Sequence, residues 1–284
     1  MGWLLLYPET LGGRLLLGLV LAGGMGGLGV WRGWLRRDGG LAATLVGTLV
    51  FAFGGWEWAV LLILFFVTSS LLSRYGAVQK QVAEGRMAKG GPRDAGQVLA
   101  NGGWLALLAL WHARQPAPWV FLAAVGALAA VMADTWSTEF GLLSTTPPRR
   151  ITTGRPVPPG TNGGVTLLGL LGAATGASLM GFVAGLLILA GDVPAGLGPG
   201  RLAGVTVASG LVGTVVDSLL GATVQAVRWC PLCREETEQD PHICGTATHR
   251  LRGWSWLDND VVNAVTSVTG SLAAVLLAFL VGLL

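Results

Sequence analysis

Long apolar stretches follow one another along this chain and are separated by short polar segments. A helix of roughly 20 apolar residues crosses the hydrocarbon core of a bilayer, and most of the stretches approach that length. The second and third stretches are short and close together, so either two half-helices or a hairpin would account for them. The pattern predicts an all-α fold, a polytopic transmembrane bundle of about eight spans. These spans are expected at 12–30, 40–54, 57–73, 96–111, 118–134, 164–190, 201–226 and 261–284.

The composition agrees with a membrane protein. Only 12% of the 284 residues are charged and 52% are hydrophobic, and the mean hydropathy is +0.63. A soluble domain carries about a quarter charged residues, so lipid is expected to cover much of this surface. The net charge of +3 is too small to indicate a nucleic-acid partner. We expect one integral membrane domain over 1–284, and the sequence does not indicate its oligomeric state.

The basic residues predict the orientation. Of the 18 lysines and arginines, all but Arg14, Arg114 and Arg201 lie in four segments, which begin near residues 31, 74, 135 and 227. With eight spans these segments share one side, and the positive-inside rule makes that side cytoplasmic. Both termini are then expected outside, in a membrane of the bacterial inner-membrane type.

Several polar residues lie inside or at the ends of the predicted spans, where such residues are rare and usually functional. On helices, three stripes are expected: Gln97 with Asn101; Asp217 with Gly221 and Gln225; and Asp260 with Asn263 and Ser267. Carboxylates are the ligands that Mg²⁺ prefers, so the residues expected at a magnesium site are Asp134, Asp217, Asp258 and Asp260. The alternative is structural: Asp134 and Asp258 would cap helices, and Asn101 and Gln225 would bond between helices.

The segment 147–164 combines arginine, threonine and paired glycines before a helix. Backbone N–H groups at glycines and a helix N-terminus favour a bound anion, and arginine adds phosphate contacts. Arg150, Gly160, Thr161 and Asn162 are therefore candidate phosphate ligands. A basic connector without a ligand would have the same composition.

All three cysteines fall in one short window beside a histidine, within the predicted cytoplasmic loop 228–257. Cys230, Cys233, His242 and Cys244 supply the ligand types and the spacing of a closed tetrahedral Zn²⁺ site. His249 is an alternative ligand, and free thiols or a redox pair are alternative interpretations. Bound zinc would be structural, because so short a polar loop cannot build its own core.

Taken in order, five motifs resemble an integral membrane family known as domain of unknown function 92, which includes a plant phytyl-phosphate kinase. The motifs span about 70–270 and are QVLANGG from Gln97, ADTWSTE from Ala133, PGTNGGV from Pro159, DSLLGA from Asp217 and WLDNDVVN from Trp256. The chain is more distantly similar to CTP-dependent polyprenol kinases such as dolichol kinase. A cysteine cluster occurs in some members of the family.

The resemblance implies a CTP-dependent kinase that transfers phosphate to a phytyl or other polyprenyl monophosphate. It would place Asp134, Glu139 and Asp217 at the reacting groups, with Asp258 and Asp260 near the metal. The residues expected around CTP (or another nucleoside triphosphate) and the lipid phosphate are Asn101, Arg150, Gly160, Thr161, Asn162, Ser218, Asn259 and Asn263. Two alternatives are a secondary transporter of an anionic lipid or metabolite and a transferase that forms a CDP-linked lipid.

Overall fold

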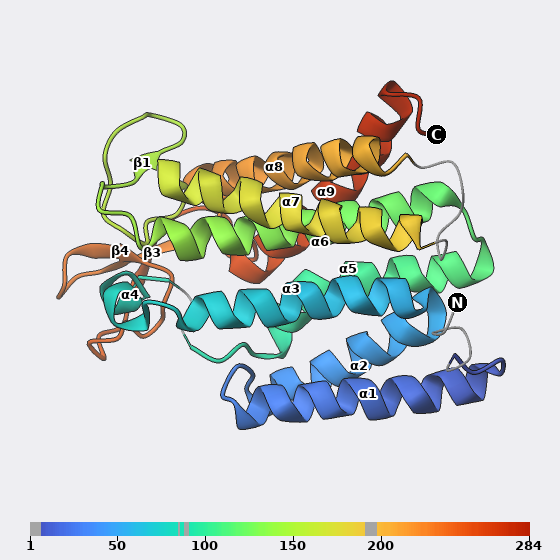
Figure 1. The fold of residues 1–284 in the computed structure, drawn as a ribbon. Helices are drawn as coiled ribbons and strands as arrows, with labels where there is room; N and C mark the ends of the chain where they lie inside the picture. Colours follow the sequence, from blue (N-terminus) through green and yellow to red (C-terminus); the bar gives the residue numbers. More distant parts are fainter. Residues whose placement is uncertain (1–6, 85, 88–90, 191–197) are drawn as a thin grey trace.

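Eight long helices form the body of the molecule in the computed structural model, which describes residues 7–84, 86–87, 91–190 and 198–284 (Figure 1). Lys89, one of the basic residues counted above, lies outside the described residues. The helices are α1 (Leu11–Trp31), α2 (Arg37–Gly54), α3 (Trp56–Arg74), α5 (Ala95–Arg114), α6 (Pro118–Gly141), α7 (Leu167–Leu189), α8 (Pro199–Thr223) and α9 (Asn259–Leu280), with a short α4 (Ala77–Glu84).

Each long helix lies where an apolar stretch predicts one, but fewer than eight are apolar enough to count as membrane spans. Six helices, α1, α3, α6, α7, α8 and α9, are long and apolar enough to cross a bilayer. The count of about eight spans is therefore not confirmed. Helix α2 opens with Arg37 and Asp38, and α5 carries Gln97, Asn101 and Arg114, which lowers the mean hydropathy of both.

Helix α6 is the centre of the bundle. Its residues from Val120 to Ala133 are all buried, and it packs against α3, α5, α7, α8 and α9. A helix that is apolar on every face belongs in such a position. Small residues bring its neighbours close: a Cβ added to Gly213 of α8 would lie 2.5 Å from the Cβ of Ala130.

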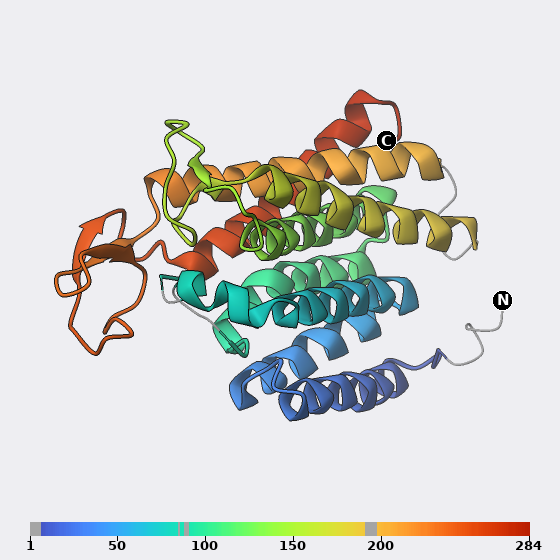
Figure 2. The same ribbon diagram turned by 60° about the vertical axis from the view of Figure 1, so that its left-hand side comes forward.

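The loops that carry the predicted polar groups gather at one end of the bundle. Figures 1 and 2 both place α4 and the strands at this end, where α6 and α8 finish and α9 begins. The opposite end holds Tyr7, whose hydroxyl donates to the backbone oxygens of Phe51 and Ala52 near the end of α2. The exposed indoles of Trp254 and Trp256 stack next to the start of α9, as is typical of a membrane interface.

Two small sheets modify the expected all-α fold. Strands β1 (Arg149–Arg150) and β2 (Gly164–Val165) pair antiparallel and close the loop before α7. Strand β3 (Val227–Cys230) lies between β4 (Glu235–Thr237) and β5 (His249–Arg252). We call residues 227–252 the Cys/His unit. The strands are too short for a periodic pattern to reveal, so the sequence predicts only loops here.

Candidate active site and metal centre

Two neighbouring polar cavities lie where the ends of α6 and α9 meet the loops. The wide cavity has a volume of about 570 Å³ and is walled by α3, α5, α6 and α9 together with Arg93. The narrow cavity has a volume of about 130 Å³ and lies between α6, α8 and the loop 159–164. They share the wall residues Met87, Asp134, Thr138, Leu142 and Asn259. Asp134 therefore faces both.

The structure brings two of the predicted carboxylates to the narrow cavity. Asp134 from α6 and Asp217 from α8 are both on its wall, and Asp217 Oδ2 accepts a hydrogen bond of 3.0 Å from Thr266 Oγ1. Among the described residues, neither carboxylate forms a salt bridge with a lysine, arginine or histidine. Two like charges on one small cavity are costly without a cation, so this pair fits a Mg²⁺ that is shared with a ligand's phosphates.

Helix α9 faces the site with a different stripe from the predicted one. Asn259 and Asn263 are on the wall of the wide cavity, and Thr266, one further turn along, reaches Asp217. The predicted stripe started at Asp260, which lies on the wall of neither cavity. The helix begins at Asn259, two residues before the predicted span, and the face that it turns to the cavities carries Asn259, Asn263 and Thr266.

Asp258 is a helix cap in the structure, which corrects its predicted role as a metal ligand. Its side chain is exposed and accepts a hydrogen bond of 3.0 Å from the backbone N–H of Val261. This is the N-cap arrangement, in which an aspartate satisfies a free N–H group in the first helical turn. The carboxylate is thereby used at the start of α9 and lies outside both cavity walls.

The glycine-containing loop lies against the end of α8. Gly160, Thr161 and Asn162 are on the wall of the narrow cavity, with Ser218 of α8. Gly163 has φ +72°, and a Cβ there would meet the backbone of Ala222 at 2.7 Å, so only glycine allows this approach.

Arg150, by contrast, points to Glu236 of the Cys/His unit, with Nη2 3.3 Å from its carboxylate. It lies on neither cavity wall. Its position in the structure is that of a link between two loops, and this differs from the predicted direct contact with phosphate.

Glu139 lies on the wall of the wide cavity but is held in an ion pair. Its Oε2 is 2.6 Å from Nζ of Lys80, whose side chain is completely buried, and Ser73 donates a hydrogen bond to Oε1. Lys80 also donates to the backbone oxygen of Leu72. Because a buried lysine needs a partner, this contact attaches α4 to α6.

Arg93 lies beside Glu139 and donates to Ser70 Oγ at 3.1 Å. Burial lowers the pKa of Arg93, and the charge of Glu139 opposes this shift.

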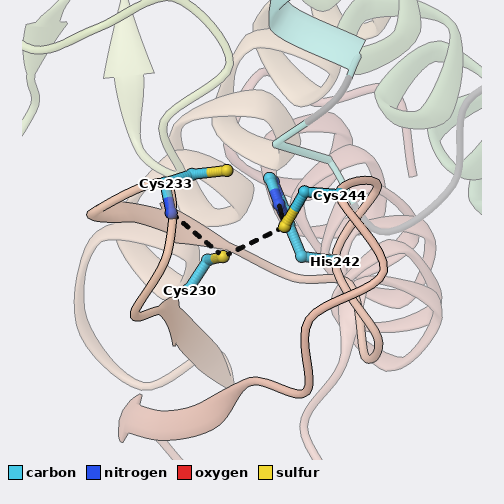
Figure 3. A group of neighbouring side chains, drawn as sticks. All are labelled: Cys230, Cys233, His242 and Cys244. Atoms are coloured by element: carbon cyan, nitrogen blue, oxygen red, sulfur yellow. Dashed lines mark hydrogen bonds between the residues drawn. The ribbon is translucent and has the colours of Figure 1, made fainter.

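The four predicted zinc ligands come together in the Cys/His unit (Figure 3). Ligand atoms of Cys230, Cys233, His242 and Cys244 all lie within 4.8 Å of one another. The sulfurs of Cys230 and Cys244 are 3.6 Å apart, and Nδ1 of His242 is 3.2 Å from the sulfur of Cys244. With Zn–S bonds of about 2.3 Å, the edges of a tetrahedral site are roughly 3.5 to 4 Å long, so these residues fit the ion. His249 is part of β5 and is not in the cluster.

A chain of polar contacts joins this cluster to the loop 159–164 of the narrow cavity. Nε2 of His242 is 3.4 Å from Oε1 of Glu235, as is usual for a metal-ligating histidine oriented by a carboxylate. Glu235 is paired with Arg86 at 2.6 Å, and Arg86 donates to the backbone oxygen of Pro159 at 3.2 Å.

Hydrogen bonds from Thr246 and His242 lower the pKa of Cys244 to about 6, which favours the thiolate that ligates metal.

Glu238 is a site residue that the sequence analysis missed. It leaves the Cys/His unit and enters the wall of the narrow cavity, where Asn162 Nδ2 donates to Oε1 at 2.5 Å and Gln225 donates to the same oxygen. It lies in an acidic run, Glu235 to Glu238, in which no single position stands out. Only the folded sheet distinguishes it.

Residues 20–282 match the integral membrane protein family DUF92. The chain belongs to this family. It is 34% identical over 262 residues to Protein PGR of Arabidopsis thaliana, covering 85% of this chain and 89% of that protein. It is 28% identical over 248 residues to Protein VTE6, chloroplastic, of the same plant, covering 86% and 65%.

An uncharacterised membrane protein of Methanocaldococcus jannaschii is 32% identical over 191 residues, covering 66% of this chain and 74% of the relative. No solved structure matches the chain. The predicted family is thereby confirmed, and with it the assignment as an integral membrane protein.

Proposed function

We propose that this protein is a Mg²⁺-dependent phosphotransferase that uses CTP or another nucleoside triphosphate to phosphorylate a phytyl or other polyprenyl monophosphate. The observation that carries the proposal is the meeting of Asp134 and Asp217 on one cavity wall, opposite the Gly160–Asn162 loop. Phosphoryl transfer depends on positioning and charge neutralisation, and this cavity offers groups for both.

The residues divide the work in the following way. Asp134 and Asp217 would hold Mg²⁺, which would neutralise phosphate charge, and Thr266 orients Asp217. Backbone N–H groups of Gly160 and Asn162 bind the transferred phosphate, with Ser218 beside them. The N–H group of Thr161 donates to the backbone oxygen of Pro158 and supports the turn. The wide cavity is faced by Asn101, Asn259 and Asn263, which orient the phosphate of the lipid acceptor. The acceptor phosphate is already ionised at neutral pH, so the reaction needs no general base.

Zinc in the Cys/His unit would have a structural role. The unit places Glu238 on the narrow cavity, holds Arg86 through Glu235, and binds the end of α8 through Arg252, which donates to the backbone oxygen of Gly221 at 3.1 Å. Burial lowers the pKa of Arg252, with Glu236 opposing the shift. These contacts would fix the site walls without touching the reacting groups.

Two further arguments support the proposal. The resemblance to a family that includes a phytyl-phosphate kinase implies this reaction class, and Protein VTE6 is a relative over 86% of this chain. The polar cavities lie at the end of the bundle where the basic segments gather, and the positive-inside rule would make that end cytoplasmic, where nucleotide is available. The whole chain would then act as one membrane domain with both termini outside.

The test uses purified protein in detergent with Mg²⁺, each nucleoside triphosphate and a panel of prenyl phosphates. We expect a prenyl diphosphate as product. Asp134→Asn and Asp217→Asn should each lose activity by about a hundredfold or more, the effect of removing one strong electrostatic contact to a transition state. Asp258→Asn is the matched control, because asparagine caps a helix as well as aspartate does and the residue lies off the cavity.

The products also separate the alternatives. With labelled CTP, a CMP conjugate in place of a diphosphate would indicate a CDP-lipid transferase. Full activity in both asparagine variants would show that the proposed metal site is wrong. Transport of a labelled prenyl phosphate into proteoliposomes without any new product would indicate the transporter.

A further inference from the structure

An apolar groove of about 300 Å³ lies between α1, α2, α3 and α5. Its walls include Ala22 and Met25 of α1, Ala43 and Val46 of α2, and Phe51 and Trp56 at the far end. The Phe51 and Trp56 rings meet edge to face with centroids 4.8 Å apart. Along α3 the wall runs from Trp56 to Phe66, which at 1.5 Å per residue is roughly 15 Å.

Charged and amide side chains enter this groove at one end only. They are Arg93, Gln97 and Asn101, and the same three residues are on the wall of the wide polar cavity. Trp56 begins α3, so it lies at the opposite end of the bundle from this junction. An apolar space and a polar space therefore adjoin each other, and a guanidinium lies at the boundary.

The shape of the groove selects among occupants. Its volume is at the low end of the range for small-molecule sites, which suits one slender chain rather than the two chains of a phospholipid. Leu21 and Ile63 are on its wall and are also exposed on the outer surface of α1 and α3. The groove thus borders the surface that faces lipid, and an apolar chain can enter from the side.

We infer that this groove binds the isoprenoid tail of the acceptor, with the anionic head held at Arg93, Gln97 and Asn101. The inference rests on the proposed function and deepens it, because it assigns the two ends of the substrate to two adjoining cavities. Arg93 uses Nη1 to bond Ser70, and its other N–H groups suit a phosphate. The groove then acts as a ruler for tail length, since Phe51 and Trp56 close its far end.

The first experiment narrows the groove. Ala43→Phe and Ala22→Phe each add a ring to the groove wall. Gly24→Phe is the control, because Gly24 is two residues from Ala22 and lies on another face of α1. It is exposed, and a Cβ there meets nothing within 4 Å. We expect the KM for a long prenyl phosphate to rise about tenfold or more in the groove variants, since each displaced methylene removes part of the apolar contact. The rise in KM should be smaller for a short prenyl phosphate, most clearly in Ala22→Phe, because Ala22 packs against Gly47, which lies one turn further from Arg93 along α2 than Ala43 does. An equal loss for short and long acceptors in both variants, at wild-type melting temperature, would overturn the inference.

The second experiment does not depend on catalysis. A prenyl phosphate with a diazirine at its tail end is photolysed with the wild-type protein, and the labelled peptides are mapped by mass spectrometry. We expect label near Phe51 and Trp56 that an excess of unlabelled prenyl phosphate removes and a two-chain phospholipid does not. Label that phospholipid displaces equally well, or that lies elsewhere, would refute the tail site.

The two experiments together separate the proposals. If the wild type transfers no phosphate yet the groove is labelled specifically, the kinase function fails and the tail site stands. If phosphate is transferred and the label lies elsewhere, the function stands and the tail site fails.

Discussion

Thr266 offers a sharp test of the proposed magnesium site, because it reaches the metal only through Asp217. Its side chain is completely buried, and its hydroxyl donates to Asp217 Oδ2 at 3.0 Å. Thr266→Val keeps the shape of the side chain and removes this one donor. Because valine has the same shape as threonine, the change should leave the backbones of α6, α8 and α9 in place.

The size of the effect follows from the bond that is lost. A hydrogen bond to a charged group is worth about 1.5–3 kcal/mol, which corresponds to a change of roughly ten- to hundredfold in an equilibrium constant. Loss of a group that orients a metal ligand costs a similar factor in affinity. We therefore expect the Mg²⁺ concentration for half-maximal activity to rise at least tenfold in Thr266→Val, with less effect on the rate at saturating Mg²⁺.

The assay is prenyl phosphate phosphorylation over a Mg²⁺ titration, with melting temperature measured in parallel. Thr266→Ser restores the hydroxyl and should return the half-maximal concentration to within about threefold of wild type. An unchanged Mg²⁺ titration in Thr266→Val, together with a normal rate, would refute the role assigned to Thr266.

Two other predictions concern the Cys/His unit. Purified protein should contain close to one zinc per chain by elemental analysis. Cys233→Ser should lose the metal and melt at a lower temperature. Metal-free wild type that melts normally would leave free thiols as the explanation. Because Cys233 and Cys244 are exposed, a membrane-impermeant thiol reagent tests the orientation: chelator-treated sealed cells should not be labelled and opened cells should be, whereas labelling in sealed cells would place the site end outside.

The positions of the helices could be predicted from the sequence because each is a continuous apolar run. The α2–α3 pair shows where apolar runs alone no longer predict the structure. Its two stretches could be half-helices or a hairpin, and the structure has two full-length helices that meet at Gly55, whose φ of +93° makes the sharp turn. The sequence contained the glycine, but α2 begins at Arg37, three residues before its predicted span, and Gly39 in this first turn lies against the backbone of Arg93.

The sequence could predict the kind of candidate site, but not every residue that lines it. Asp134 and Asp217 stand out because a carboxylate in an apolar run has few structural uses. Glu139 shares the same helix and the same charge, yet it pairs with Lys80, and only the packing of α4 against α6 could reveal that. Glu238 depends on a sheet whose strands are three or four residues long, and so short a strand leaves no periodic pattern.

The close approach of α6, α8 and α9 has a consequence for how the protein can move. A Cβ at Gly210 of α8 would lie 3.1 Å from the backbone oxygen of Ala129 of α6, and one at Gly270 of α9 would lie 2.5 Å from the Cβ of Ala130, so backbones touch where side chains usually separate them. Helices in such contact slide or part only at the cost of many atomic contacts at once. The two carboxylates are therefore carried on a rigid frame. Any rearrangement during the proposed reaction would therefore fall to the loop 142–166 and to the Cys/His unit, which lie outside this frame.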